Sequence, residues 1–277
     1  MSTAASSAAS SADAFRQLHA QPGAFVIPNP WDIGSARILA SLGYKALATS
    51  SAGMAFAYGL GDGKVAPDRV LAHCRDIVGA TDLPVSADLE NGFADSPEGV
   101  AETIHSFAGT GLAGGSIEDS TGKPDAPIYG FDQAVERVAA AAEMAGKVAG
   151  GFVLTARAEN FLHGRPDLDD TIRRLQAFEK AGADVLFAPG LPDLDAIRTV
   201  CKEVSKPVSV MMGIPGRTFS VDELTAAGVT RISTGPALAR AAYTALIEAA
   251  GEVRDSGTFD FAIRALGSGK IVQHFGG

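Results

Sequence analysis

Short apolar runs alternate with amphipathic stretches along almost the whole chain. The runs are bounded by turn residues, and several of the stretches between them close with Gly, as a helix C-terminus does. Eight runs are predicted strands, over residues 24–29, 45–50, 84–90, 114–119, 151–159, 184–190, 207–213 and 231–236. Strands that are apolar almost throughout, each followed by a helix, indicate a parallel sheet covered on its faces.

The number of these units favours a closed sheet over an open one. Eight β/α units in 277 residues predict an α/β fold of the (β/α)8 TIM-barrel type. An open doubly wound sheet would more often carry a Gly-rich phosphate turn after its first strand, where this chain has NPWDIG. We expect a disordered Ser/Ala-rich tail over residues 1–12 and a single barrel domain over residues 13–277, with extra C-terminal helices.

Composition and charge exclude several classes of protein. The net charge of -9, without a basic stripe, argues against a nucleic-acid partner. No apolar run has the length of a membrane span, and the first residues lack the features of a secretory signal, so we expect no membrane partner and a cytoplasmic location. Cys74 and Cys201 lie far apart without a CxxC, which indicates neither a disulfide framework nor a zinc site.

Charged and polar residues gather at the carboxyl ends of the predicted strands. Asp88 and Glu90 lie two apart on one predicted strand and should therefore share a face. In a barrel, side chains at these strand ends point into the mouth where active sites lie. The other rim residues are Asn29, Asp62, Glu118 and Arg157. Several carboxylates and one Arg at a single rim indicate a functional site.

The crowded carboxylates predict a metal ion. Carboxylates placed close together repel one another unless a cation lies between them. Oxygen ligands with few nitrogens or sulfurs select Mg²⁺, with Mn²⁺ as the alternative. The candidate metal ligands are Asp62, Asp88, Glu90 and Glu118. Zinc is disfavoured because no histidine falls on a strand end, although His163 follows the fifth strand closely.

Arg157 and the metal together describe a substrate. An Arg side chain binds a carboxylate in bidentate fashion, and a neighbouring Mg²⁺ can chelate an oxo group and stabilise the enolate formed when an adjacent bond breaks. The backbone N–H groups of Ser51, Ala52 and Gly53 are candidates to hold the other carboxylate oxygens. The predicted ligand is a small α-oxocarboxylate.

Five segments at these strand ends carry a family resemblance. TSSAGMA, GLGDG, SADLENGFAD, SIEDS and TARAEN, in this order, resemble the isocitrate lyase/phosphoenolpyruvate mutase superfamily, and the similarity extends from about Asn29 to Ala242. The resemblance implies a Mg²⁺-dependent barrel whose members make or break C–C or C–P bonds next to an α-oxocarboxylate. It also implies a swapped C-terminal helix between paired subunits, so we expect a homo-dimer or homo-tetramer.

The resemblance also implies roles for individual residues. Asp88 resembles the carboxylate nearest the metal, while Asp62, Glu90 and Glu118 resemble those that hold its waters. Arg157 and the Ser51–Gly53 backbone resemble the clamp on the substrate carboxylate and oxo group. Glu90 stands where many members have Asp, which keeps the charge and lengthens the side chain by one methylene.

Departures from the superfamily pattern narrow the reaction. Isocitrate and methylisocitrate lyases carry a Cys- and His-containing loop after the fourth strand, and this chain has the shorter EDSTGKPDAPIYGF. Their Glu after the sixth strand and Asn after the seventh are replaced by FAPG and MMGIPG, and the gating loop of the phosphonomutases is missing. Isocitrate cleavage and C–P rearrangement are therefore disfavoured.

Several functions remain open. The retained residues suit decarboxylation or hydrolysis of an oxaloacetate-like acid, or lyase cleavage of a malate-like one. Tyr58 and Tyr129 are candidate proton donors, and residues 121–128 resemble a mobile lid. The alternatives are a phosphonopyruvate-type C–P bond enzyme, a non-catalytic oxo-acid-binding protein of the same fold, and an unrelated phosphate-binding barrel enzyme.

Overall fold

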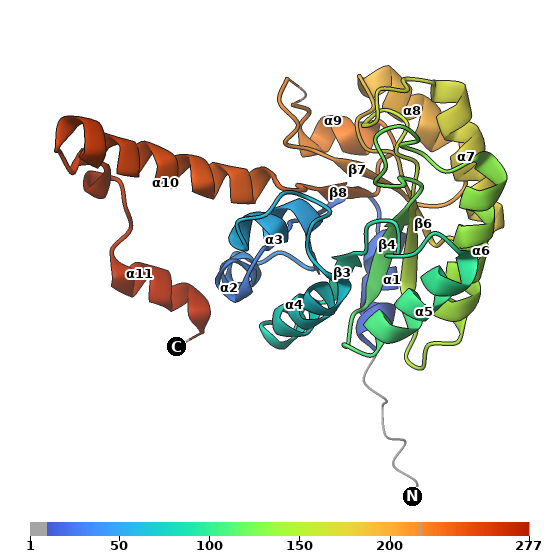
Figure 1. Ribbon diagram of the computed structural model, residues 1–277, viewed down its shortest axis with the longest axis horizontal. Helices are drawn as coiled ribbons and strands as arrows, with labels where there is room; N and C mark the ends of the chain where they lie inside the picture. Colours follow the sequence, from blue (N-terminus) through green and yellow to red (C-terminus); the bar gives the residue numbers. More distant parts are fainter. Residues whose placement is uncertain (1–9, 217, 277) are drawn as a thin grey trace, which may run out of the picture.

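Eight parallel strands with helices between them form a nearly closed (β/α)8 barrel (Figure 1), as the sequence predicted. The structure is a computed structural model that describes residues 10–216 and 218–276. The strands are β1 (Phe25–Ile27), β2 (Leu47–Ala48), β3 (Val85–Asp88), β4 (Gly114–Glu118), β5 (Val153–Arg157), β6 (Val185–Phe187), β7 (Val208–Met211) and β8 (Arg231–Ser233). They pair in the order β1-β8-β7-β6-β5-β4-β3-β2.

Between β1 and β2, which are not paired as strands, two hydrogen bonds bring the edges of the barrel together. The Ala48 N–H donates to the Pro28 carbonyl at 3.1 Å, and the Asn29 side-chain amide donates to the Thr49 carbonyl at 2.9 Å. Every observed strand is shorter than its predicted range, because the hydrogen-bonded ladder ends where the chain turns into the loops at the mouth.

Helices follow the strands, and several of them begin with side-chain caps. The helices of the barrel are α2 (Ile33–Ser41), α3 (Ser51–Ala57), α4 (Pro67–Gly79), α5 (Pro97–Ala108), α6 (Phe131–Gly146), α7 (Leu168–Lys180), α8 (Leu194–Glu203) and α9 (Val221–Ala226). Oxygen atoms of Asp32, Ser50 and Ser96 each accept a first-turn N–H of the helix that follows. These caps satisfy donors that have no partner within the helix, and they fix where each helix starts.

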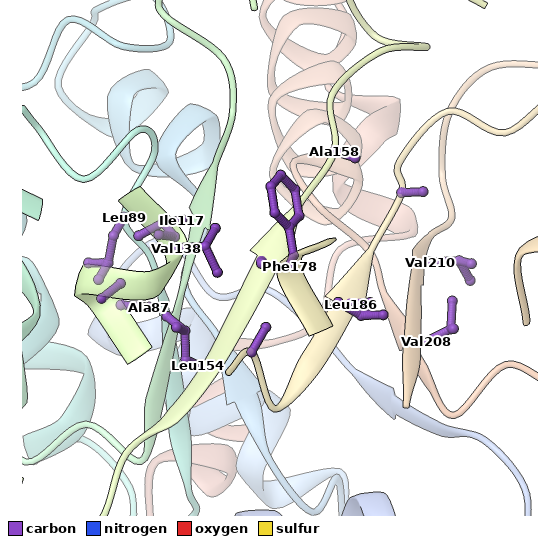
Figure 2. Close-up of a cluster of buried hydrophobic side chains, with 14 of the residues drawn as sticks. Ala87, Leu89, Ile117, Val138, Leu154, Ala158, Phe178, Leu186, Val208 and Val210 are labelled. Carbon is purple, nitrogen blue, oxygen red and sulfur yellow. The ribbon is translucent and has the colours of Figure 1, made fainter. Parts of the chain in front are cut away.

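The hydrophobic core lies between the outer faces of the strands and the helices. Figure 2 shows Leu154, Leu186 and Val208 on the strands, with Val138 of α6 and Phe178 of α7 among the same buried cluster. Successive strand residues point to opposite faces, so the neighbours of these apolar residues point into the barrel. The inward face is therefore free to carry polar side chains.

The helix α1 (Ser11–Ala20) packs at the amino ends of the strands. Its Phe15 is fully buried against a cluster formed by Ile27, Ala46, Ala113, Val153 and Val185. Most of the predicted tail, residues 1–9, lies outside the described residues. Its end was predicted wrongly, because Ser11 and Ala12 are helical and Ala12 is buried.

The C-terminal region extends the barrel, as predicted. The helix α10 (Ala237–Ser256) projects away from the strands (Figure 1), and η1 (Asp260–Ile263), α11 (Ser268–Val272) and η2 (Gln273–Phe275) follow it. The chain returns to α2, where His274 Nδ1 lies 2.7 Å from Ser41 Oγ. No helix in the described part of the chain combines the length and apolar character that a bilayer crossing requires.

Candidate functional site

Arg157, at the carboxyl end of β5, is the centre of the site. Its Nη1 lies 3.0 Å from Asp88 Oδ1, its Nη2 lies 3.2 Å from Glu118 Oε2, and its Nε lies 2.9 Å from Glu159 Oε1. The Arg157 side chain is 12% exposed, and its guanidinium lies over the Phe187 ring, 5.0 Å from the centroid. One buried cation thus joins carboxylates from β3, β4 and the loop after β5.

Asp88 is fixed by the start of α3 as well as by Arg157. Its Oδ2 accepts the Ser51 N–H at 3.2 Å and the Ser51 hydroxyl at 2.9 Å. Its own N–H donates to Thr49 Oγ1 at 2.9 Å. The carboxylate therefore points into the barrel mouth, as the sequence predicted.

Glu90 reaches the site by a different route from the predicted one. The strand β3 ends at Asp88, Leu89 is fully buried in the core, and Glu90 has a left-handed backbone with φ of 48°. The prediction that Asp88 and Glu90 share a strand face is therefore wrong, because the chain leaves the strand between them. Glu90 still lines the larger of two cavities at the mouth.

Two adjoining cavities open at the carboxyl ends of the strands. The larger measures about 720 Å³ and includes Glu90, Glu118 and His163 in its lining. The smaller measures about 240 Å³ and includes Asp88 and residues deeper in the barrel. Ser51, Asp62, Arg157 and Leu162 line both cavities. The Arg157 cluster therefore stands where the two cavities meet.

The carboxylates of the site are crowded enough to disturb one another. Burial, and then the negative charges of Asp88 and Asp62, raise the pKa of Glu90 to about 7. The pKa of Asp62 is also raised, by burial and then by Asp88. Burial raises the pKa of Glu118 well above its ordinary value, against the opposing attraction of Arg157.

This donor set fits a hard divalent cation. The carboxylates of Asp62, Asp88, Glu90, Glu118 and Glu159 line the two cavities around the Arg157 guanidinium, and among the described lining residues His163 is the one that offers an imidazole nitrogen. Among the described residues, no three Asp, Glu, His or Cys side chains converge tightly enough to form a ready metal centre. Mg²⁺ often binds through one or two carboxylates and keeps several waters, so a looser ring of carboxylates is compatible with it.

The three predicted backbone donors are not equally available. The Ser51 N–H donates to Asp88, and the Gly53 N–H donates to the Ser50 hydroxyl that caps α3. The Ala52 N–H lies between them and has no partner within the described part of the chain. Ala52 also lines the smaller cavity, so its N–H is the donor of the three that faces a ligand.

Asn29 links neighbouring strands and also lines the smaller cavity, and its predicted contact with the substrate stays a prediction. Its side chain is buried, and its Oδ1 accepts the N–H groups of Thr234 and Gly235, both at 2.9 Å. Its Nδ2 donates to the Thr49 carbonyl. Asn29 therefore ties β8, β1 and β2 together, and its oxygen has no capacity left for a ligand.

The two tyrosines predicted as proton donors lie away from both cavity linings. Tyr58 ends α3, is 43% exposed, and has the Arg69 guanidinium 5.2 Å from its ring centroid. Tyr129 is buried, with its hydroxyl donating to Asp95 and accepting from Asn91. The Tyr129 hydroxyl therefore reaches the larger cavity only through Asn91 and Asp95, which line it.

The predicted lid, residues 121–128, is folded into a small hairpin. Ser120 and Ile128 pair as an antiparallel bridge, and the Thr121 N–H donates to the Pro127 carbonyl at 2.9 Å. Lys123 forms an exposed ion pair with Asp95 at 2.9 Å. The hairpin covers one side of the larger cavity, and its mobility stays a prediction.

Sequence reasoning places Glu159 at the end of the fifth strand without giving it a role, and it leaves Arg231 out of the site. Glu159 ion-pairs with Arg157, and its N–H donates to Asp119 at 2.8 Å. Arg231, the first residue of β8, points into the barrel and lines the smaller cavity. The sequence signal for Arg231 is that it is the one charged residue, at the first position, of the predicted strand over residues 231–236.

Comparison with known proteins places the chain among related enzymes. Residues 15–254 match the family of phosphoenolpyruvate phosphomutase. A solved structure from Burkholderia cenocepacia J2315, which carries the provisional description of a lyase/mutase, is 55% identical, with a TM-score of 0.94 over 96% of this chain and 95% of that one.

Two curated relatives have named activities. The 2-methylisocitrate lyase of Escherichia coli K12 is 34% identical over 68% of this chain and 65% of its own length. The oxaloacetate decarboxylase of Paraburkholderia xenovorans LB400 is 28% identical over 93% of this chain and 87% of its own length.

Proposed function

The chain belongs to the phosphoenolpyruvate phosphomutase family, and from this premise we propose that it is a Mg²⁺-dependent enzyme that acts on a small α-oxocarboxylate or 2-hydroxy acid through an enolate. The reaction would be C–C bond cleavage, decarboxylation or hydrolysis of an oxaloacetate-like acid. The observation that carries this proposal is Arg157 held by carboxylates of three chain segments where two cavities meet.

Arg157 supports the proposal because part of its bonding capacity is unused. A guanidinium has five N–H donors, and the three contacts to Asp88, Glu118 and Glu159 leave two of them. Two donors suit one carboxylate of a substrate. The three acidic partners hold the guanidinium in place, so binding would cost little side-chain entropy.

The carboxylates would hold the metal, with Asp88 nearest and Asp62, Glu90 and Glu118 acting through water. A Mg²⁺ ion in that position would polarise the oxo or hydroxyl oxygen of the substrate as a Lewis acid. The Ala52 N–H and Ser51 would complete the clamp from the start of α3. His163 and Glu90 both line the larger cavity and are partly exposed, so either would be a candidate to move a proton there.

The oxaloacetate-like substrate is favoured over the alternatives by two observations. The decarboxylase relative matches nearly the whole chain, and the loop after β4 lacks the Cys and His that the lyase pattern carries. A phosphonopyruvate-type C–P bond enzyme and a non-catalytic oxo-acid-binding protein are the competing functions.

Turnover should depend on a divalent cation. We expect product from at least one acid in a panel of 2-oxo and 2-hydroxy acids with Mg²⁺ or Mn²⁺, followed by mass spectrometry. Chelation with EDTA should lower the rate by at least about 100-fold, because the carboxylates alone repel an anionic substrate. Full turnover after exhaustive chelation would contradict the metal requirement, and metal-dependent binding without product would favour the binding protein.

We also propose that the chain assembles through its C-terminal helices. Leu246 and Ile247 on α10 are 61% and 70% exposed, and Phe259 and Ile263 beyond it are 65% and 84% exposed. Exposed apolar groups gathered on one projecting region are typical of an interface. A second copy of the chain is the occupant that the resemblance implies.

Light scattering at micromolar concentration should therefore show a dimer or tetramer. The double variant Leu246→Glu/Ile247→Glu should shift the mass to the monomer, because it places two charges in the contact. Val221→Glu, which also charges an exposed apolar position (43%) but on α9, is the matched control and should leave the assembly intact. A monomeric parent chain would refute the proposal.

A further inference from the structure

The inside of the barrel below the site is unusually polar. TIM barrels are commonly filled by bulky branched apolar side chains. The inward positions here include Ser86, Ser116, Thr155, Ser209, Arg231 and Ser233, all buried. Their small side chains, together with Ala48, leave the smaller cavity of about 240 Å³ beneath the Arg157 cluster.

Arg231 lies in this cavity and is braced only by uncharged groups. It is 5% exposed; its Nε donates to Ser209 Oγ and its Nη2 to Thr155 Oγ1, both at 3.0 Å. Its Nη1 lies 3.4 Å from Nε2 of His19 on α1. His19 is neutral, because burial, and then the charge of Arg231, lowers its pKa to about 3. Its Nδ1 lies 2.8 Å from the Phe15 carbonyl, so Nε2 is free to accept.

The positive charge of Arg231 has no acidic partner. No carboxylate of the described chain forms an ion pair with it, whereas Arg157 has three. Burial, and then the charge of Arg157, lowers the pKa of Arg231 to about 9, so it remains protonated near neutral pH. A buried charge without a counter-charge is costly to the fold, and a cavity beside it offers a place for an anion.

We propose that the smaller cavity is a carboxylate-binding chamber in which Arg231 receives the second carboxylate of a dicarboxylic substrate whose first carboxylate is held by Arg157. This inference rests on the proposed function and adds to it the residue that would bind the second carboxylate. Arg231 has two N–H donors beyond its three contacts, which match one carboxylate. The chamber is smaller than the roughly 300–1,000 Å³ of drug-sized pockets, which suits a short acid.

The residues that line the chamber indicate that the anion bound there is part of the substrate and not an unrelated ion. The chamber shares Ser51, Asp62 and Arg157 with the larger cavity, so it adjoins the place where the substrate binds. The ends of β6 and β7 contribute Phe187 and Met211, which cannot pair with a second carboxylate. Two cations, Arg157 and Arg231, are among the described residues that line the chamber. Arg157 is ion-paired with carboxylates, whereas Arg231 has no ion pair with any described residue.

The test compares two stable 2-hydroxy acids that differ by one carboxylate. Lactate and malate are titrated calorimetrically in Mg²⁺ against the full chain and against Arg231→Met. The parent should bind malate at least about tenfold more tightly, because Arg231 would add charge-assisted hydrogen bonds to the second carboxylate. In Arg231→Met the malate preference should fall to less than about twofold, with lactate binding changed by less than about threefold.

A structural role for Arg231 predicts a different pattern. Ser209→Ala removes one brace of Arg231 but keeps its charge, so it should retain the malate preference. Thermal unfolding by circular dichroism should show that both variants fold. An equal preference for malate in the parent and in Arg231→Met would overturn the proposal, and so would a parent with no preference.

A separate outcome would concern the proposed function. If neither acid binds the parent in Mg²⁺ and the panel of 2-oxo and 2-hydroxy acids gives no product, the proposed metal-dependent function fails. Anion binding in the chamber is then tested separately, by collecting anomalous diffraction data from crystals soaked in sodium bromide. Anomalous density beside Arg231 in the parent, absent from Arg231→Met, supports an anion chamber, and its absence from the parent shows that Arg231 is only a structural brace.

Discussion

Replacing Arg157 with Met should destabilise the metal-free protein by about 3–5 kcal/mol near neutral pH, the range for breaking a buried ion pair by removing one partner. The guanidinium is the common partner of Asp88, Glu118 and Glu159, whose side chains are 16%, 17% and 3% exposed. Without it, three buried carboxylates face one another. Urea unfolding in EDTA, followed by the fluorescence of Trp31, measures the loss.

The deficit should depend on pH in a defined direction. Burial already raises the pKa values of Glu118 and Glu159 above the ordinary value of 4.5, and Arg157 opposes the rise. A carboxyl with a raised folded-state pKa stabilises the fold fully below its unfolded pKa and loses that contribution as pH rises through the folded value. The variant should therefore approach the parent near pH 4.5 and fall furthest behind at alkaline pH.

The control for this variant is an exposed Arg in an ion pair. Arg198→Met removes a contact to Asp195 on α8, where the two side chains are 42% and 91% exposed. Its effect should stay below about 1 kcal/mol at every pH, as for other surface pairs. A deficit for Arg157→Met that is equally small, or that does not grow with pH, would show that the carboxylates need no counter-charge.

The fold followed from the sequence because the strands are defined locally. Each predicted run carries its own apolar pattern and is followed by a helix, so all eight strands were found. Their ends were predicted too long, because the ladder stops where partner strands stop. Leu89 continues the apolar pattern after Asp88, yet it packs in the outer core while the chain turns left-handed at Glu90. Alternation along a strand could not reveal that turn.

The sequence predicted which charged residues lie at the rim of the site, but it did not predict which partners each residue contacts. Parallel strands place their carboxyl ends on one edge, so Asp88, Glu118 and Arg157 had to meet there. The hydrogen bonds of Asn29 could not be predicted, because its partners, Thr234 and Gly235, lie at the other end of the chain. Only barrel closure brings them together.

Arg231 shows the same limit in the barrel interior. Its position on an inward face follows from strand alternation once the ends of β8 are known. Its environment does not, because His19 comes from the first helix and Thr155 from a strand that does not neighbour β8. Tyr58 and Tyr129 were misplaced for the related reason that loop directions depend on contacts such as those of Arg69 and Asp95.

Asp88→Ala should abolish divalent-cation binding while leaving the barrel folded. Asp88 contacts both Arg157 and Ser51, and its charge raises the pKa values of Asp62 and Glu90. It is thus the carboxylate that the others surround. We expect Mn²⁺ affinity, measured by the electron paramagnetic resonance of free Mn²⁺, to fall by more than about 100-fold. Glu90→Ala should cost about tenfold, within the 10–100-fold typical of outer-shell partners.

The same variant makes a prediction that needs no metal. Burial is the main cause of the raised Glu90 pKa and Asp88 is the second. Removing Asp88 should lower the Glu90 titration midpoint from about 7 without returning it to 4.5, as carboxyl ¹³C NMR of the metal-free protein would show. Asp195→Ala, at a 91% exposed position, is the control and should leave both the midpoint and Mn²⁺ binding unchanged. Mn²⁺ affinity in Asp88→Ala within about threefold of the parent would place the cation elsewhere, since a lost ligand costs more than a lost outer-shell partner.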